Sequence, residues 1–116
     1  MKNLKTSTLL AEIMTSIIYS TTSNAEEAKK IAKSLVEEKL VACVNIIPNI
    51  TSIYRWQGKI EEDSECVLIA KTTDKNVEKA INKIKDLHSY DVPDIISFPI
   101  TKGLNEYLQY VEDETK

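Results

Sequence analysis

The sequence of 116 residues is poor in glycine, arginine, histidine and cysteine. Glycine occurs only at Gly58 and Gly103, so no glycine-rich loop of the kind that wraps a phosphate is present. Arg55 is the only arginine and the formal net charge is −3, so a nucleic-acid partner is not expected. Two cysteines, Cys43 and Cys66, are too few for a disulfide framework, and we expect both to be reduced and packed as small hydrophobic residues.

Long apolar runs are also missing. No segment approaches the ~18 consecutive apolar residues that a membrane span requires, so no membrane partner is expected. The start of the chain resembles a secretory signal only weakly, because Glu12 interrupts its apolar stretch. We therefore expect residues 1–13 to be a disordered extension, and residues 14–116 to form one domain of a cytoplasmic protein.

What the sequence does contain is a regular alternation of strand and helix patterns. Gln57-Gly58 predicts the tight turn of a long hairpin, and Pro48 predicts a bulge within its first strand. Asn24 can cap the first helix, and Glu27 stands where a capping-box acid belongs. The predicted strands cover residues 14–19, 41–56, 59–72 and 94–100, and the predicted helices cover residues 25–39, 73–87 and 104–111.

The order β-α-β-β-α-β with a short C-terminal helix predicts an α+β fold, the ferredoxin-like sandwich. In this fold a four-stranded antiparallel sheet carries both long helices on one face, and its other face should be polar. Residues 41–44 and 66–70 are instead apolar at consecutive positions, so both faces should be covered. Nothing in so short a chain is left to cover the second face, and we therefore expect a homo-oligomer.

Three segments resemble the motifs of a known family. They are LVEEKLVACVNI at residues 35–46, TSIYRWQGK at 51–59 and HSYDVPDI at 88–95. In sequence and spacing they are similar to the CutA family of divalent-cation tolerance proteins. The resemblance implies a ferredoxin-like homotrimer whose long hairpins interlock. It also implies a non-enzymatic role in divalent-metal tolerance or response, with copper or another divalent cation as a ligand.

The resemblance carries over only part of a metal site. The copper ligands proposed for the family fall at Ser20, Leu87 and His88, and of these only His88 is a good ligand. Cys43 and His88 are therefore the candidate metal ligands in this chain. For His88, at the end of a predicted helix, a structural role as a helix cap is favoured over the ligand role. If the hairpin turn has two residues, the residue numbers of each facing pair add up to 115. Cys43 then lies opposite Thr72.

The hairpin also carries aromatic and acidic side chains. Tyr54 and Trp56 share one face and are predicted to be interface anchors between subunits rather than a ligand platform. Consecutive strand residues point to opposite faces, so the four acidic residues within 61–65 are not expected to converge on a cation. A solvated strand that resists aggregation is the prediction for this segment.

Two other functions remain open. Small acylphosphatases share the fold but need an arginine in a phosphate-binding loop, whereas Arg55 lies in the hairpin, and His88 has no evident nucleophile partner. An enzyme is therefore not expected. The alternative is a trimeric small-molecule or anion sensor of the nitrogen-regulator type, although the tight turn at Gln57-Gly58 leaves no room for the long signalling loop of such sensors.

Overall fold

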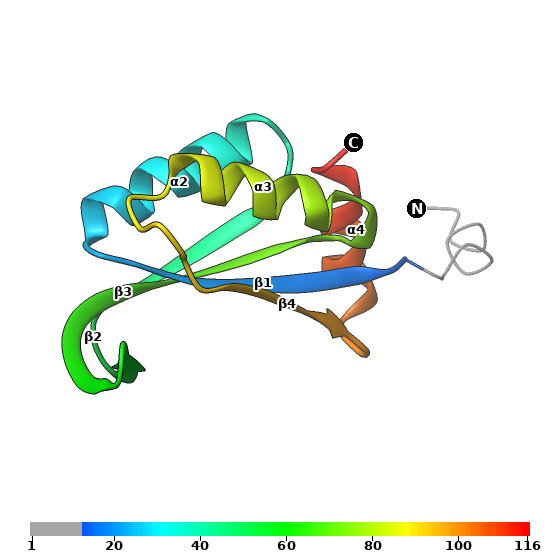
Figure 1. Ribbon diagram of the computed structural model, residues 1–116. Coiled ribbons are helices and arrows are strands. Elements are labelled where there is room, and N and C mark those ends of the chain that lie inside the picture. The colour runs from blue at the N-terminus through cyan, green and yellow to red at the C-terminus, as the bar shows by residue number, and fades with distance from the viewer. Residues whose placement is uncertain (1–12) are drawn as a thin grey trace, which may run out of the picture.

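The computed structural model describes residues 13–116, and its elements follow the predicted order (Figure 1). The predicted disordered extension, residues 1–13, lies outside the described range except for Ile13. The strands are β1 (Thr15–Thr22), β2 (Cys43–Trp56), β3 (Lys59–Thr73) and β4 (Ile95–Ile100). The helices are α2 (Ala25–Glu37), α3 (Val77–Leu87) and α4 (Asn105–Asp113), with a short 3-10 turn η1 (Asp74–Asn76) before α3.

The four strands form one antiparallel sheet in the order β2-β3-β1-β4. Helices α2 and α3 lie side by side on one face of this sheet, the upper face in Figure 1. The predicted α+β class and ferredoxin-like sandwich are confirmed. Among residues 13–116, no helix combines the length and the apolar character that a bilayer crossing requires.

The core lies between the sheet and these two helices. It forms because apolar residues recur at helical spacing along α2 and α3 and at every second position along the strands facing them. Its fully buried side chains include Ile18, Ile31, Leu35, Leu68 and Ile84.

Helix α2 begins as its sequence predicts. The Asn24 side chain accepts a hydrogen bond from the Glu27 amide at 2.8 Å, which satisfies one free donor of the first turn. The Glu27 carboxylate accepts from the Ser23 amide and hydroxyl at 3.1 and 2.8 Å, one residue before the expected capping-box partner. The helix start is thereby fixed from both sides.

The hairpin of β2 and β3 contains the predicted bulge. From Trp56 back to Ile50, the residue numbers of each facing pair add up to 115. Beyond Pro48 and Asn49 they add up to 114, because these two residues of β2 oppose a single residue of β3. Cys43 therefore lies opposite Lys71. The predicted pairing of Cys43 with Thr72 is wrong, because it was counted without the bulge.

The outer half of the hairpin curls away from the sheet, at the lower left of Figure 1. Extra twist is what a bulge produces in a paired strand. The Cα radius of gyration is 16.0 Å, against about 13 Å for a compact chain of 100 residues. The hairpin is thus an arm that protrudes from the folded body.

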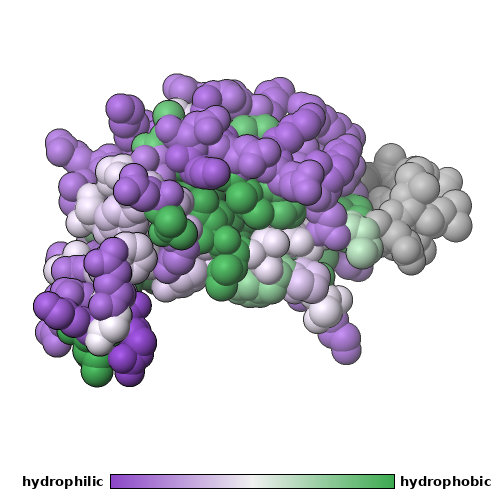
Figure 2. Space-filling model, viewed as in Figure 1, coloured by the Kyte–Doolittle hydropathy of each residue, from purple (hydrophilic) through white to green (hydrophobic). Residues whose placement is uncertain are grey.

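The second face of the sheet is only partly covered. Helix α4 packs over one end of it, with Val111 fully buried and the Tyr110 hydroxyl donating to the Ala42 carbonyl at 3.4 Å. The prediction that nothing in the chain could cover this face is therefore wrong at that end. Elsewhere Ile96 is 57% and Phe98 46% exposed, and Figure 2 shows hydrophobic side chains gathered below the polar helices, along the sheet.

Candidate functional site

His88 is held on both sides of its ring. It is the C-cap residue of α3, and its side chain is 0% exposed. Nε2 donates to the Thr21 carbonyl at 2.7 Å, and Nδ1 accepts from the Tyr90 amide at 3.1 Å. This pattern places the ring proton on Nε2 and leaves no free lone pair for a metal. The geometry favours the structural role, in which the ring joins the end of α3 to β1.

Glu27 holds the same segment from the side of α2. Its Oε2 accepts the Ser89 amide at 2.7 Å, and it lies 3.7 Å from His88 Nδ1, too far for a hydrogen bond. Partial burial acts to raise the pKa of Glu27, but the hydrogen bonds from Ser23 and Ser89 outweigh it and the pKa is lowered. The carboxylate is therefore a fixed anion that clamps the 88–90 segment onto the start of α2.

Cys43 lies elsewhere, in a different environment. It is half-buried, and its Sγ is 4.0 Å from Lys71 Nζ, which also donates to Asn45 Oδ1 at 2.5 Å. The same Nζ lies 5.8 Å from the centre of the Tyr107 ring. Burial, together with the neighbouring Cys43, raises the pKa of Tyr107. The thiol therefore has a cation and a phenol beside it.

The two candidate metal ligands are not brought together. His88 contacts Thr21, whereas Cys43 faces Lys71, which pairs with Ile17. Thr21 and Ile17 are four residues apart along β1, which is a distance of about 13 Å. Across residues 13–116, no three His, Cys, Asp or Glu side chains are grouped to hold a metal ion.

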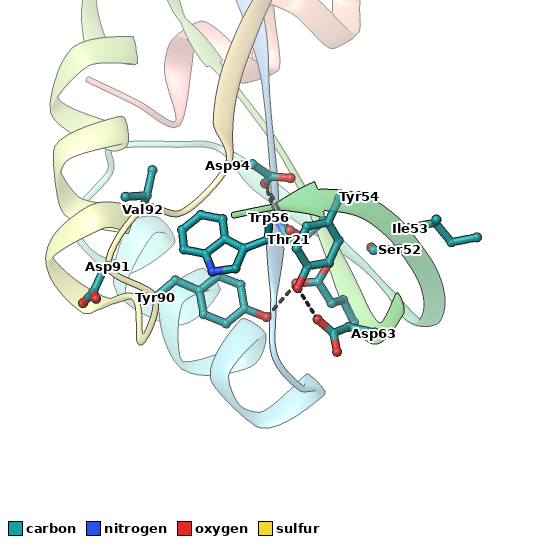
Figure 3. Close-up of a pocket in the computed structure, with 11 residues that line it drawn as sticks. Thr21, Ser52, Ile53, Tyr54, Trp56, Asp63, Tyr90, Asp91, Val92 and Asp94 are labelled. Carbon is teal, nitrogen blue, oxygen red and sulfur yellow. Dashed lines mark hydrogen bonds between the residues drawn. The ribbon is translucent and has the colours of Figure 1, made fainter. Parts of the chain in front are cut away.

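A cavity of about 620 Å³ lies where the curled hairpin meets the segment that leads into β4. Figure 3 shows its residues coming from the hairpin, from β1 and from residues 90–94. The side chains that give it chemical character are Tyr54, Trp56, Asp63, Glu65, Tyr90 and Asp94.

Two phenol–carboxylate pairs lie in this cavity. The Tyr54 hydroxyl donates to Asp63, and the Tyr90 hydroxyl donates to Glu65 at 2.6 Å. The hydrogen bond to Asp63 and the surrounding negative charge raise the pKa of Tyr54 to about 12. Burial and the hydrogen bond to Glu65 raise the pKa of Tyr90 well above its usual range. Both phenols are therefore neutral donors at physiological pH.

The acidic segment differs from its prediction in two respects. Glu65 is only 9% exposed, so the prediction of a solvated strand is wrong at that position. Asp63 and Glu65 are two positions apart and share the face of Ser52 and Tyr54, so both reach the cavity. Sequence reasoning considered consecutive acids and missed this alternate pair. The recruitment of Tyr90 had no local signal, because it depends on the curl of the hairpin.

Comparison with known proteins agrees with the three sequence motifs. The family model described as CutA1 divalent ion tolerance protein matches residues 16–114. The divalent-cation tolerance protein CutA of Thermus thermophilus is 47% identical over 102 residues, which cover 88% of this chain and 99% of that protein. The chloroplastic protein CutA of Arabidopsis thaliana is 45% identical over 100 residues, which are 86% of this chain but 55% of that protein.

The fold agrees as well. The solved structure of the divalent cation tolerance protein CutA1 from Thermus thermophilus superposes with a TM-score of 0.86 at 47% identity. The match covers 89% of this chain and 100% of that one. On motifs, fold and these matches, the chain belongs to the CutA1 family of divalent ion tolerance proteins.

Proposed function

We propose that this chain forms a homotrimer that serves in divalent-metal tolerance, without enzymatic activity, in the cytoplasm, and that it binds copper weakly. Family membership supports the role in divalent-cation tolerance. The cytoplasmic location rests on the sequence alone, since the Arabidopsis relative is named as chloroplastic.

The observation that carries the assembly is the open apolar face of the sheet together with the protruding hairpin. Ile96 and Phe98 are about half exposed on this face, and Ile47 is 46% exposed on the same face of β2. Exposed apolar surface of this kind, gathered on one side, is typical of a subunit contact. Tyr54 and Trp56, at 40% and 51% exposure, are the proposed anchors on the hairpin.

Copper binding is proposed to be weak because residues 13–116 bring no group of three metal-ligating side chains together. Both nitrogens of His88 are engaged, so of the two candidate ligands the half-buried thiol of Cys43 remains. Cys43 lies on the second face of the sheet, in register with Ile17 and Lys71, at the end that α4 covers and beside Tyr107. Partial cover by α4 is a second reason to expect weak binding there.

Titration of the reduced protein with Cu(I) in competition with a chelator tests this proposal. Cys43→Ser should abolish the weak binding, whereas Cys66→Ser, a buried thiol on the helix side of the sheet, should leave it unchanged. Equal copper binding by the two variants would contradict a role for Cys43. His88→Ala should change copper binding only as far as it unfolds the protein.

The cavity favours a second candidate function, the small-molecule sensor. Its volume of about 620 Å³ is that of a small-molecule site, and its side chains come from separate segments. A thermal-shift screen with metabolites would support this function if a ligand raises the unfolding temperature of the assembled protein.

A further inference from the structure

We propose that the cavity between the curled hairpin and residues 90–94 binds a small organic ammonium ion. This site is separate from any copper site at Cys43, which lies at the other end of β2. The proposal goes beyond metal tolerance and does not depend on it.

The first argument is the charge of the cavity. Its lining includes four carboxylates, and among the described residues that line it none is lysine, arginine or histidine. The ion pairs found within residues 13–116 involve other acids. An anionic ligand is therefore disfavoured and a cation is favoured. The four carboxylates belong to Asp63, Glu65, Asp91 and Asp94.

The second argument concerns which of these carboxylates are free to bind. Asp94 Oδ1 already accepts the amide and hydroxyl of Thr21 at 3.0 and 3.1 Å, so Asp94 serves the fold. Asp63 and Glu65 each accept one phenol hydroxyl. A carboxylate can accept about four hydrogen bonds, so both keep acceptor capacity for an ammonium group.

Glu65 is the decisive residue. A carboxylate that is 9% exposed and bonded to a neutral phenol carries a charge that water solvates poorly. Buried charges are normally compensated by a partner of opposite sign. No lysine or arginine of the described chain supplies one, and a cationic ligand in the cavity would.

The third argument is the aromatic wall. Figure 3 shows the rings of Tyr54, Trp56 and Tyr90 drawn around the same cavity. Tyr54 and Trp56 are also the proposed subunit anchors, so the cavity borders the proposed contact between subunits. Aromatic faces attract cations, and most strongly where water is excluded. Val92 adds apolar surface for the body of a ligand.

These features favour an organic cation over a metal ion. No group of three metal-ligating side chains occurs in the part of the chain that the structure describes. Aromatic rings are poor ligands for a hard, hydrated cation but good neighbours for an alkylammonium group.

Trp56 allows a direct test, because it is the only tryptophan of the chain and lines the cavity. Its fluorescence should change saturably when phenethylammonium chloride is titrated into the assembled protein. The neutral analogue 2-phenylethanol, which replaces the ammonium group by a hydroxyl, should bind at least about tenfold more weakly, the ratio given by one lost charge contact. Added salt should weaken the ammonium binding alone.

Matched variants locate the site. Glu65→Gln should reduce ammonium affinity about tenfold and bring it close to that of the alcohol, by the same ratio. Asp63→Asn, at an exposed position, repeats this test should Glu65→Gln fail to fold. Glu62→Gln makes the same change of charge on the opposite face of β3 and should leave both affinities unchanged.

Equal affinity for amine and alcohol, no saturable signal, or equal loss in Glu62→Gln and Glu65→Gln would each overturn the proposal. A neighbouring subunit that fills the cavity would also give no saturable signal, and would therefore overturn the proposal as well. The outcome is independent of metal tolerance, since copper binding and oligomeric state are measured separately. A trimer that binds copper but no amine contradicts only this inference.

Discussion

At the scale of single residues, the side chains of His88 and Glu27 hold the 88–90 segment in place through hydrogen bonds. The imidazole joins Thr21 on β1 to the Tyr90 amide, and the carboxylate joins Ser23 at the start of α2 to the Ser89 amide. Tyr90, at the end of this loop, reaches the cavity through Glu65. The stability of the cavity wall thus depends on two side chains that do not line it.

Replacement of His88 by alanine should destabilise the protein by about 2–4 kcal/mol. The change removes a buried ring and leaves the Thr21 carbonyl and the Tyr90 amide without partners, each at a cost of about 1–3 kcal/mol if it stays dry. Urea unfolding followed by circular dichroism measures the loss. Asp86→Ala, at an exposed position near the end of the same helix, is the control and should change stability by less than about 0.5 kcal/mol. A His88→Ala loss no larger than that of the control would contradict the structural role.

Glu27 should make stability depend on pH. Its pKa is lowered in the folded state, so its stabilising contribution is present above the unfolded-state pKa and disappears as pH falls through the folded-state pKa. Glu27→Gln should therefore cost about 1–2 kcal/mol at pH 7, and the difference from the parent protein should shrink below about pH 4. Thermal unfolding across pH 3–7 tests this, with Glu26→Gln as the exposed control on the same turn. A difference that does not vary with pH would contradict the assignment.

At the scale of elements, the sequence predicted what local patterns encode. Helix spacing, the Asn24 cap, the Gln57-Gly58 turn and the strand alternation are properties of neighbouring residues, and all appear in the structure. The bulge at Pro48 was predicted, but its effect on register was not. One extra residue shifts every pair beyond it, which moved the partner of Cys43 from Thr72 to Lys71. The curl of the hairpin, and with it the cavity, arises from twist along the whole ribbon and has no signal at any single position.

The hairpin turn offers a test at this scale. Gln57 and Gly58 have φ of 50° and 81°, the pattern of a type I′ turn, in which a side chain at the glycine position is strained. No heavy atom lies within 4 Å of a Cβ placed at Gly58, so Gly58→Ala should cost only the backbone strain, about 1 kcal/mol. Asparagine tolerates positive φ better than glutamine does. Gln57→Asn should therefore increase the free energy of unfolding, by a few tenths of the roughly 1 kcal/mol that Gly58→Ala costs. The same sign for both variants in urea unfolding would contradict this account of the turn.

At the scale of the whole molecule, one face of the sheet is only partly covered by the chain. Helix α4 covers one end, and the remainder presents half-exposed apolar side chains beside a protruding arm. The sequence predicted the apolar character of both faces because consecutive apolar residues are visible in it. The partial cover by α4 could not be read from it, because where a terminal helix docks depends on tertiary packing.

Phe98→Glu should convert the proposed trimer into a smaller species. Phe98 is 46% exposed on the open face of β4, and burial of this exposed part in a contact would contribute roughly 1 kcal/mol per subunit. A carboxylate in its place would have to be desolvated without a partner, so association should weaken and apparent stability should become more dependent on protein concentration. Light scattering coupled to size-exclusion chromatography measures the species directly. Val36→Glu, which alters a similarly exposed apolar residue on α2 at the opposite side of the sheet, should leave the assembly intact. If Phe98→Glu stays as assembled as Val36→Glu at every dilution, the open face is not the contact between subunits, and the apolar anchors on the hairpin would have to carry the assembly alone.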